Sequence, residues 1–279
     1  MAGNRQLKTG AAILAGALLL AACNRHDDSI WDGSGLEATP GIAPVSDVPA
    51  TLDNTASTVP LSHDEAARQL LDGFNANAKQ GHSDAALIAA VFKRRPASLD
   101  TCADAYVKAL EAGESDYEAG RACGAAIRSV VVEEGVSAIL KGDDQTVADH
   151  AAVTLEEYRL FARENVQDCA LTAAGLMPLP GSAELARLRE KESALTIKLM
   201  NQPADSTRAV TPLPEMNDWL VALGRAHPEA QRGAALIGQT DPTDDEAAAI
   251  CQTMITIFDE LEKLPVQERA AHYRRMTSM

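Results

Sequence analysis

The chain has 279 residues, of which 40 are acidic and 25 are lysine or arginine, so its net charge is −15 at neutral pH. This excess of negative charge argues against a nucleic-acid-binding protein and against binding to anionic lipid headgroups, because both require clustered cations. Aromatic residues make up only 4% of the chain and alanine is abundant, which is typical of closely packed helices rather than strands.

The first 23 residues have the layout of an export signal. Arg5 and Lys8 precede an apolar run of 12 residues, 11–22, which ends in Leu20-Ala21-Ala22-Cys23. A bilayer span needs roughly 20 apolar residues, so a transmembrane helix is not expected. An ordinary cleaved signal peptide is the other reading, but the cysteine directly after small residues favours a lipid-modified one.

This pattern resembles the lipobox of bacterial lipoproteins. The resemblance implies that residues 1–22 are removed as a signal peptide and that Cys23 is acylated, which would hold the protein in the lipid bilayer. It also implies the outer membrane with the protein facing the periplasm, rather than the inner membrane, because Asn24 and not aspartate follows the cysteine. Loss of Arg5 and Lys8 would bring the net charge to about −17.

Residues 23–60 are predicted to be the lipidated cysteine followed by a flexible linker. Residues 24–60 show no apolar periodicity and contain four prolines and three glycines among serine, threonine and aspartate. As a flexible coil these 37 residues would have a root-mean-square reach of about 35 Å.

The remaining residues, 61–279, are predicted to form an all-α multi-helix globular bundle in one domain. Apolar residues recur at helical spacing, and Ser62, Ser115 and Thr243 each precede a glutamate by three residues, as in a capping box. The stretch 202–214 is the best candidate for a domain boundary, but the 65 residues after Pro214 would be marginal as an independent unit. The predicted helices cover about 62–79, 83–95, 98–112, 115–141, 146–175, 182–200, 215–226, 228–237, 243–263 and 265 onward.

Four cysteines follow the linker, and two disulfides are predicted. Cys102 and Cys123 lie at nearly equal distances from Gly113, so two antiparallel helices joined there would place them at the same height. Cys169 and Cys251 then pair by elimination. In a reducing compartment buried free thiols would be the better reading, whereas an oxidising periplasm favours the bonds.

Chemical motifs are scarce. The sequence has no nucleotide-binding loop, no serine-nucleophile elbow and no metal-ligand spacing, so no catalytic residue, metal or cofactor is predicted. His150 is expected at the surface or in a helix cap, and the consecutive acids Glu133-Glu134 and Glu156-Glu157 are expected in solvent. Lys93-Arg94-Arg95 is expected to complement a helix C-terminus, and Trp219 to be a core or half-buried anchor.

Three classes of function fit this pattern. The favoured one is a helical module that binds or inhibits another protein of the cell envelope. The alternatives are a periplasmic enzyme acting on cell-wall or envelope material, which an acidic cleft with a converging histidine and carboxylate would support, and a passive scaffold or small-ligand carrier. For a basic partner, the candidate contact residues are Asp241, Asp244, Asp245, Glu246, Asp259, Glu260 and Glu262.

Overall fold

The computed structural model describes residues 61–175, 181–239 and 241–279. The predicted signal peptide, Cys23 and the linker therefore lie outside the described residues. Within the described ranges the fold is all-α, with no strand. None of the helices in these ranges is both long and apolar enough to cross a membrane.

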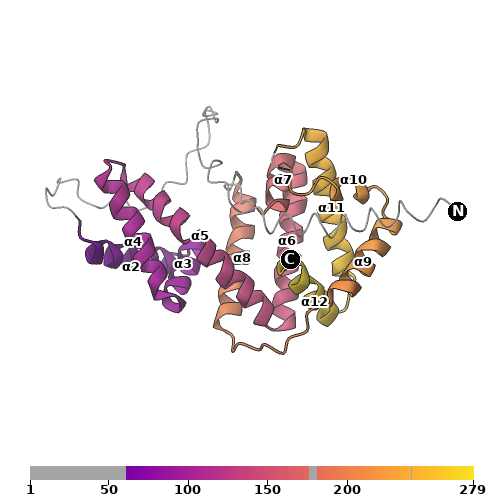
Figure 1. Ribbon diagram of the computed structural model, residues 1–279, viewed down its shortest axis with the longest axis horizontal. Coiled ribbons are helices and arrows are strands. Elements are labelled where there is room, and N and C mark those ends of the chain that lie inside the picture. The colour runs from indigo at the N-terminus through magenta and orange to yellow at the C-terminus, as the bar shows by residue number, and fades with distance from the viewer. Residues whose placement is uncertain (1–60, 176–180, 240) are drawn as a thin grey trace.

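Figure 1 shows the helices laid out along the long axis of the molecule. Helices α2, α3 and α4 pack together at one end, α6, α7 and α9 to α12 lie at the other, and α5 and α8 run between them. The bounds are α2 His63–Lys79, α3 Ser83–Arg94, α4 Pro96–Glu111, α5 Asp116–Lys141, α6 Asp144–Glu164, α7 Val166–Ala173, α8 Ala183–Asn201, α9 Leu213–Ala226, α10 Ala230–Ala234, α11 Asp244–Glu262 and α12 Val266–Thr277.

The predicted caps begin three of these helices. Ser115 and Thr243 each form a complete capping box, in which the hydroxyl accepts from the backbone N–H of the glutamate three residues later and that glutamate accepts from the cap's own N–H. At Ser62 the structure has the first of these bonds, from Glu65 N at 3.3 Å. These bonds satisfy N–H groups that the first helical turn would otherwise leave unpaired.

Helices α4 and α5 form an antiparallel hairpin around Gly113, whose φ of +85° suits a residue without a Cβ. Cys102 and Cys123 are bonded across this hairpin, in the expected pairing. They are buried in a small cluster with Phe92 and Ile127 at the α2–α4 end of the molecule.

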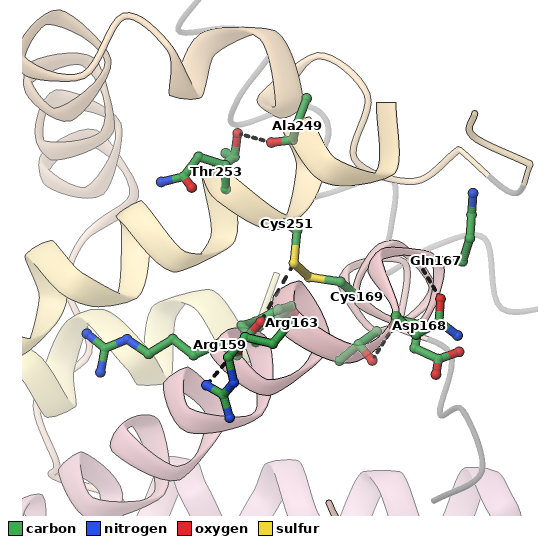
Figure 2. The surroundings of a disulfide bond; sticks show 12 residues. Arg159, Arg163, Gln167, Asp168, Cys169, Ala249, Cys251 and Thr253 are labelled. Carbon is green, nitrogen blue, oxygen red and sulfur yellow. Dashed lines mark hydrogen bonds between the residues drawn. A yellow bond between two sulfur atoms is a disulfide. The ribbon is translucent and has the colours of Figure 1, made fainter. Parts of the chain in front are cut away.

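The larger core lies at the other end. Helix α11 contributes a buried stripe at spacings of three and four residues, comprising Ala247, Ile250, Cys251, Met254, Ile257, Phe258 and Leu261. Cys251 is bonded to Cys169 of α7, the second expected pair, and Figure 2 shows this disulfide crossing between the two helices. The bond joins residues 82 positions apart and so fixes the C-terminal third of the chain to the middle.

The short helix α10 is pressed closely onto α11. A Cβ on Gly233 would lie 2.0 Å from the Ala249 carbonyl oxygen, so only glycine fits here. Thr253 donates to the carbonyl oxygens of Ala230 and Ala249, and Figure 2 shows the second of these bonds. The chain between α9 and α10 lies beside the C-terminal end of α11, where His227 contacts Glu260.

One predicted helix is wrong. Instead of a continuous helix over 146–175, α6 ends at Glu164 and α7 begins at Val166. Asn165 between them is extended, with φ −159° and ψ 101°, and its side chain accepts from the Gln167 N–H. An asparagine side chain competes in this way with the helical hydrogen bonds, and here it starts a new helix.

Three predictions of exposed polar residues are also wrong. His150, Glu134 and Glu157 are 4%, 4% and 2% exposed, while Glu133 and Glu156 are in solvent as expected. Consecutive residues on a helix point about 100° apart, so one member of each acidic pair can face solvent while the other faces inward. Each buried group has polar partners on other helices, which sequence spacing does not reveal.

Glu134 also accounts for the basic residues at the end of α3. Arg94 Nε and Arg95 Nε donate to its two carboxylate oxygens at 2.7 and 2.6 Å. These hydrogen bonds, Arg94's first, hold the pKa of Glu134 below its usual range. Arg94 also donates to the Met200 carbonyl oxygen, so the cluster ties α3 to both α5 and α8.

Candidate functional site

The seven candidate acidic residues divide between the two ends of α11. Asp241, Asp244, Asp245 and Glu246 lie at its N-terminal end, and Asp259, Glu260 and Glu262 at its C-terminal end. Glu246 and Asp259 are 13 positions apart, which corresponds to roughly 20 Å along a helix. The structure therefore does not bring the two groups together.

The N-terminal group serves mainly the start of the helix. Glu246 completes the capping box, and its hydrogen bonds with Thr243, the backbone N–H first, lower its pKa. Asp244 accepts from Gln167 Nε2 at 2.8 Å and so connects α11 to α7. Asp241 and Asp245 are exposed.

The C-terminal group lines an open groove of about 510 Å³, which we call the α11 groove. Its walls come from α6, from the connection between α9 and α10, and from the last turns of α11. The lining residues are Arg159, His227, Glu229, Gln252, Thr256, Asp259, Glu260, Glu262 and Lys263. Four acidic side chains, two permanent cations and one histidine thus surround one solvent-facing hollow.

The acidic side chains of the groove already have partners. Arg159 of α6 pairs with Asp259 at 2.5 Å, and Lys263 pairs with Glu260 at 2.5 Å. The Lys263 hydrogen bond is the largest factor that lowers the pKa of Glu260. Glu262 pairs with Arg269 at 2.9 Å. The groove is therefore a surface of mixed charge rather than a purely acidic one.

His227 brings the groove close to a catalytic arrangement. Its Nε2 lies 2.8 Å from Glu260 Oε1, and its Nδ1 lies 3.3 Å from Glu229 Oε1. A histidine held by one carboxylate can act as a general base if its second nitrogen faces the substrate. Here both nitrogens face carboxylates, so the ring is placed as a link between two acidic side chains.

Only part of this groove is predictable from the sequence. Glu260 and Lys263 are three residues apart on a helix, a spacing that predicts an ion pair. Arg159 and His227 come from segments 100 and 33 residues away from their partners, and nothing local in the sequence marks them. The open groove arises from the folding of α9 and α10 against α11.

A second polar cluster lies in the interior, between α6 and α8. Glu157 of α6 faces Arg189 of α8, which also pairs with Glu192. His150 and Tyr273 are in contact with each other beside this group. Burial raises the pKa of Glu157 to about 8, the Glu192 charge adds to the rise, and Arg189 opposes it. This cluster has no counterpart among the residues singled out from the sequence as a site.

Within residues 61–175, 181–239 and 241–279, no three side chains of histidine, cysteine, aspartate or glutamate converge as ligands. Trp219 is half-buried against the main core and meets His272 edge-on, as expected for an anchor.

Comparison of the chain with protein-family models, with curated proteins and with solved structures found no match.

Proposed function

We propose that this protein is a lipid-anchored component of the bacterial cell envelope whose helical part binds another envelope protein through the α11 groove. The anchor is Cys23, proposed from the lipobox resemblance, with Asn24 favouring the outer membrane and a periplasmic orientation. The predicted linker would let the helical part reach a partner away from the bilayer while keeping it concentrated near the membrane.

The observation that carries the proposal is the groove of about 510 Å³ with side chains of both signs around it. Alternating charges recognise a partner by complementarity, since each ion pair on the rim can exchange its internal partner for an external one. The acidic surplus of the chain favours a partner segment with more cations than anions. Gln252 is exposed within the groove and can donate or accept hydrogen bonds.

A second candidate function is catalysis in the same groove, which the His227–Glu260 contact of 2.8 Å favours. In a hydrolase of envelope material, Glu260 would orient the ring and His227 would accept a proton from water or a hydroxyl group. That role requires Glu229 to release Nδ1, whereas a binding role uses the arrangement as it stands. Binding is therefore the proposal the geometry supports better.

Filling the groove tests the proposal. A tagged chain with Gln252→Trp would be purified from detergent-solubilised envelopes beside the wild type and beside Ala194→Trp, which adds the same ring to an exposed position on α8. We expect a defined co-purifying protein with the wild type and Ala194→Trp, and at least a tenfold lower yield with Gln252→Trp. Equal recovery from all three proteins would remove the groove as the binding site.

Catalysis in the groove would be tested separately, by measuring substrate turnover. The purified helical part would be incubated with peptidoglycan, peptide and ester substrates. Turnover that is lost in His227→Gln, while partner recovery stays at the wild-type level, would replace the binding proposal by the catalytic one.

A further inference from the structure

Charged side chains are buried between α6 and α8. Glu157 is 2% exposed and Arg189 is 9% exposed. Arg189 Nε lies 3.5 Å from Glu157 Oε1, an ion pair in which that oxygen receives no hydrogen bond. Arg189 Nη1 donates instead to Glu192 Oε2 at 3.1 Å, and Arg189 Nη2 is also without a hydrogen-bond partner. Two carboxyl groups therefore share one guanidinium; the Glu157 side chain is buried, and the Glu192 side chain is 25% exposed.

The remaining groups around the cluster do not supply a second positive charge. From α6, the His150 ring has both nitrogens engaged. Its Nε2 lies 3.2 Å from the Thr196 hydroxyl oxygen, and its Nδ1 lies 3.0 Å from the Tyr273 hydroxyl oxygen. Burial lowers the pKa of His150, so the ring stays neutral at physiological pH.

The other elements that pack against α6 contribute uncharged or distant groups. Tyr273 of α12 and Tyr158 of α6 have pKa values that burial raises, so both keep their protons. Helix α11 faces Tyr158 with the ring of Phe258. Helix α7 carries Asp168, which lies 11 positions after Glu157 and beyond the break at Asn165. Lys191 of α8 pairs on the exposed side with Glu156.

We propose that the contact between α6 and α8 is proton-linked: the closed contact holds one proton on the Glu157–Arg189–Glu192 cluster, and loss of that proton loosens α8. With the proton bound, one carboxylate and one guanidinium balance each other. Without it, the cluster carries one negative charge in excess, and the buried Glu157 carboxylate has little access to water. Opening the contact to solvent lowers the free energy of that charge.

The sign of the effect follows from the direction of the shift. The pKa of Glu157 rises from its ordinary value of 4.5 to about 8, so the closed contact binds more protons than the open one between these values. The contribution of the proton to stability is complete below pH 4.5 and is lost as the pH rises towards 8. Alkaline conditions therefore favour the loosened form.

Loosening of α8 would also affect helices other than α6. This helix packs on α6 at one end of the molecule and on α3 and α5 at the other. Ser193, next to Glu192, donates to Asp84 of α3 at 3.1 Å. Loosening α8 would therefore loosen the connection between the α2–α4 end and the end that carries the α11 groove.

Hydrogen exchange measured by mass spectrometry tests the proposal on the whole folded protein. Exchange of the α8 amides would be followed from pH 6 to pH 9, corrected for the intrinsic pH dependence of exchange, in the wild type, Glu157→Gln and Glu156→Gln. The wild type and Glu156→Gln should show an opening equilibrium of α8 that rises at least tenfold over this range, because one pKa unit corresponds to a factor of ten. Glu157→Gln, which cannot ionise, should show a flat profile.

A pH-independent opening in the wild type, or the same rise in Glu157→Gln, would overturn the proposal. If Glu157→Gln does not fold, infrared spectroscopy of the wild type decides. A carbonyl stretching band of a protonated buried carboxyl group should be present at pH 6 and disappear towards pH 9, and its absence at pH 6 would equally overturn the proposal.

Discussion

Arg274 is the largest side chain in the structure with no exposed surface. Its guanidinium donates to the carbonyl oxygens of Ile139, Ala209 and Gly142 and to Asp144 Oδ1 at 2.7 Å. Arginine carries five donors in a fixed plane, so one side chain can satisfy the end of α5, the start of α6 and the loop before α9 together. Through these bonds α12 holds the turn between α5 and α6 together with the loop before α9.

Replacing Arg274 by methionine should be strongly destabilising. The change removes the charge and leaves Asp144 and three carbonyl groups without their donor, which typically costs about 3–5 kcal/mol. Urea unfolding at neutral pH would measure this loss. Arg225→Met, at an exposed position of α9, is the matched control and should stay within about 0.5 kcal/mol of the wild type. A loss below 1 kcal/mol for Arg274→Met would contradict this role.

Residues such as Arg274, His150, Glu134 and Glu157 could not be placed from the sequence. A helical pattern shows which residues share a face, but a polar residue is buried only because of partners brought by other helices. Those partners lie 40 residues away for Glu134 and 123 to 135 residues away for the His150–Tyr273 and Arg274–Ile139 contacts. The structure supplies that tertiary information and the local sequence does not.

Among the helices, the starts were more predictable than the interruptions. Capping boxes at Ser115 and Thr243 are local signals of four residues, and both formed where expected. The hairpin disulfide was also predictable, because a turn at Gly113 fixes which residues of α4 and α5 stand at equal height. The break at Asn165 was missed because one asparagine in an otherwise helical stretch can either face solvent or restart the helix.

Glu134 controls how α3 attaches to α5 and α8, and it leads to a pH prediction. Its pKa is lowered by the Arg94 and Arg95 hydrogen bonds, so its stabilising effect is complete above the ordinary glutamate value and is lost as the pH falls through the lowered one. Glu134→Gln should lower the free energy of unfolding by about 2 kcal/mol at pH 7. The loss is no larger because both arginines are partly exposed and solvent weakens their interaction with Glu134.

Denaturant unfolding at several pH values would check this prediction, with Glu133→Gln as the exposed neighbouring control. The difference between wild type and Glu134→Gln should shrink as the pH falls into the acid range, because the wild-type carboxylate then becomes protonated. A difference that stays constant with pH would show that the charge of Glu134 is not what holds α3.

On the scale of the whole molecule, the proposed function joins the α11 groove of the helical part to a lipid anchor. The all-α architecture and both disulfides agree with the expectation from composition, periodicity and cysteine spacing. The α11 groove emerged only from the packing of helices, because its lining comes from three separate parts of the chain. The anchor at Cys23 and the linker stay predictions from the sequence, and they give the groove its proposed place at the membrane.

Site-specific photo-crosslinking in living cells tests the anchored binder most directly. A photoreactive phenylalanine derivative at Gln252, in the groove, would be compared with the same group at Ala194, on the exposed side of α8. Each would be placed in the wild-type chain and in Cys23→Ser. We expect one defined protein adduct from position 252, none from position 194, and a several-fold lower yield in Cys23→Ser because the tether no longer raises the local concentration. An adduct from position 194 alone, or an equal yield from 252 with and without Cys23, would contradict a groove that binds its partner from a lipid anchor.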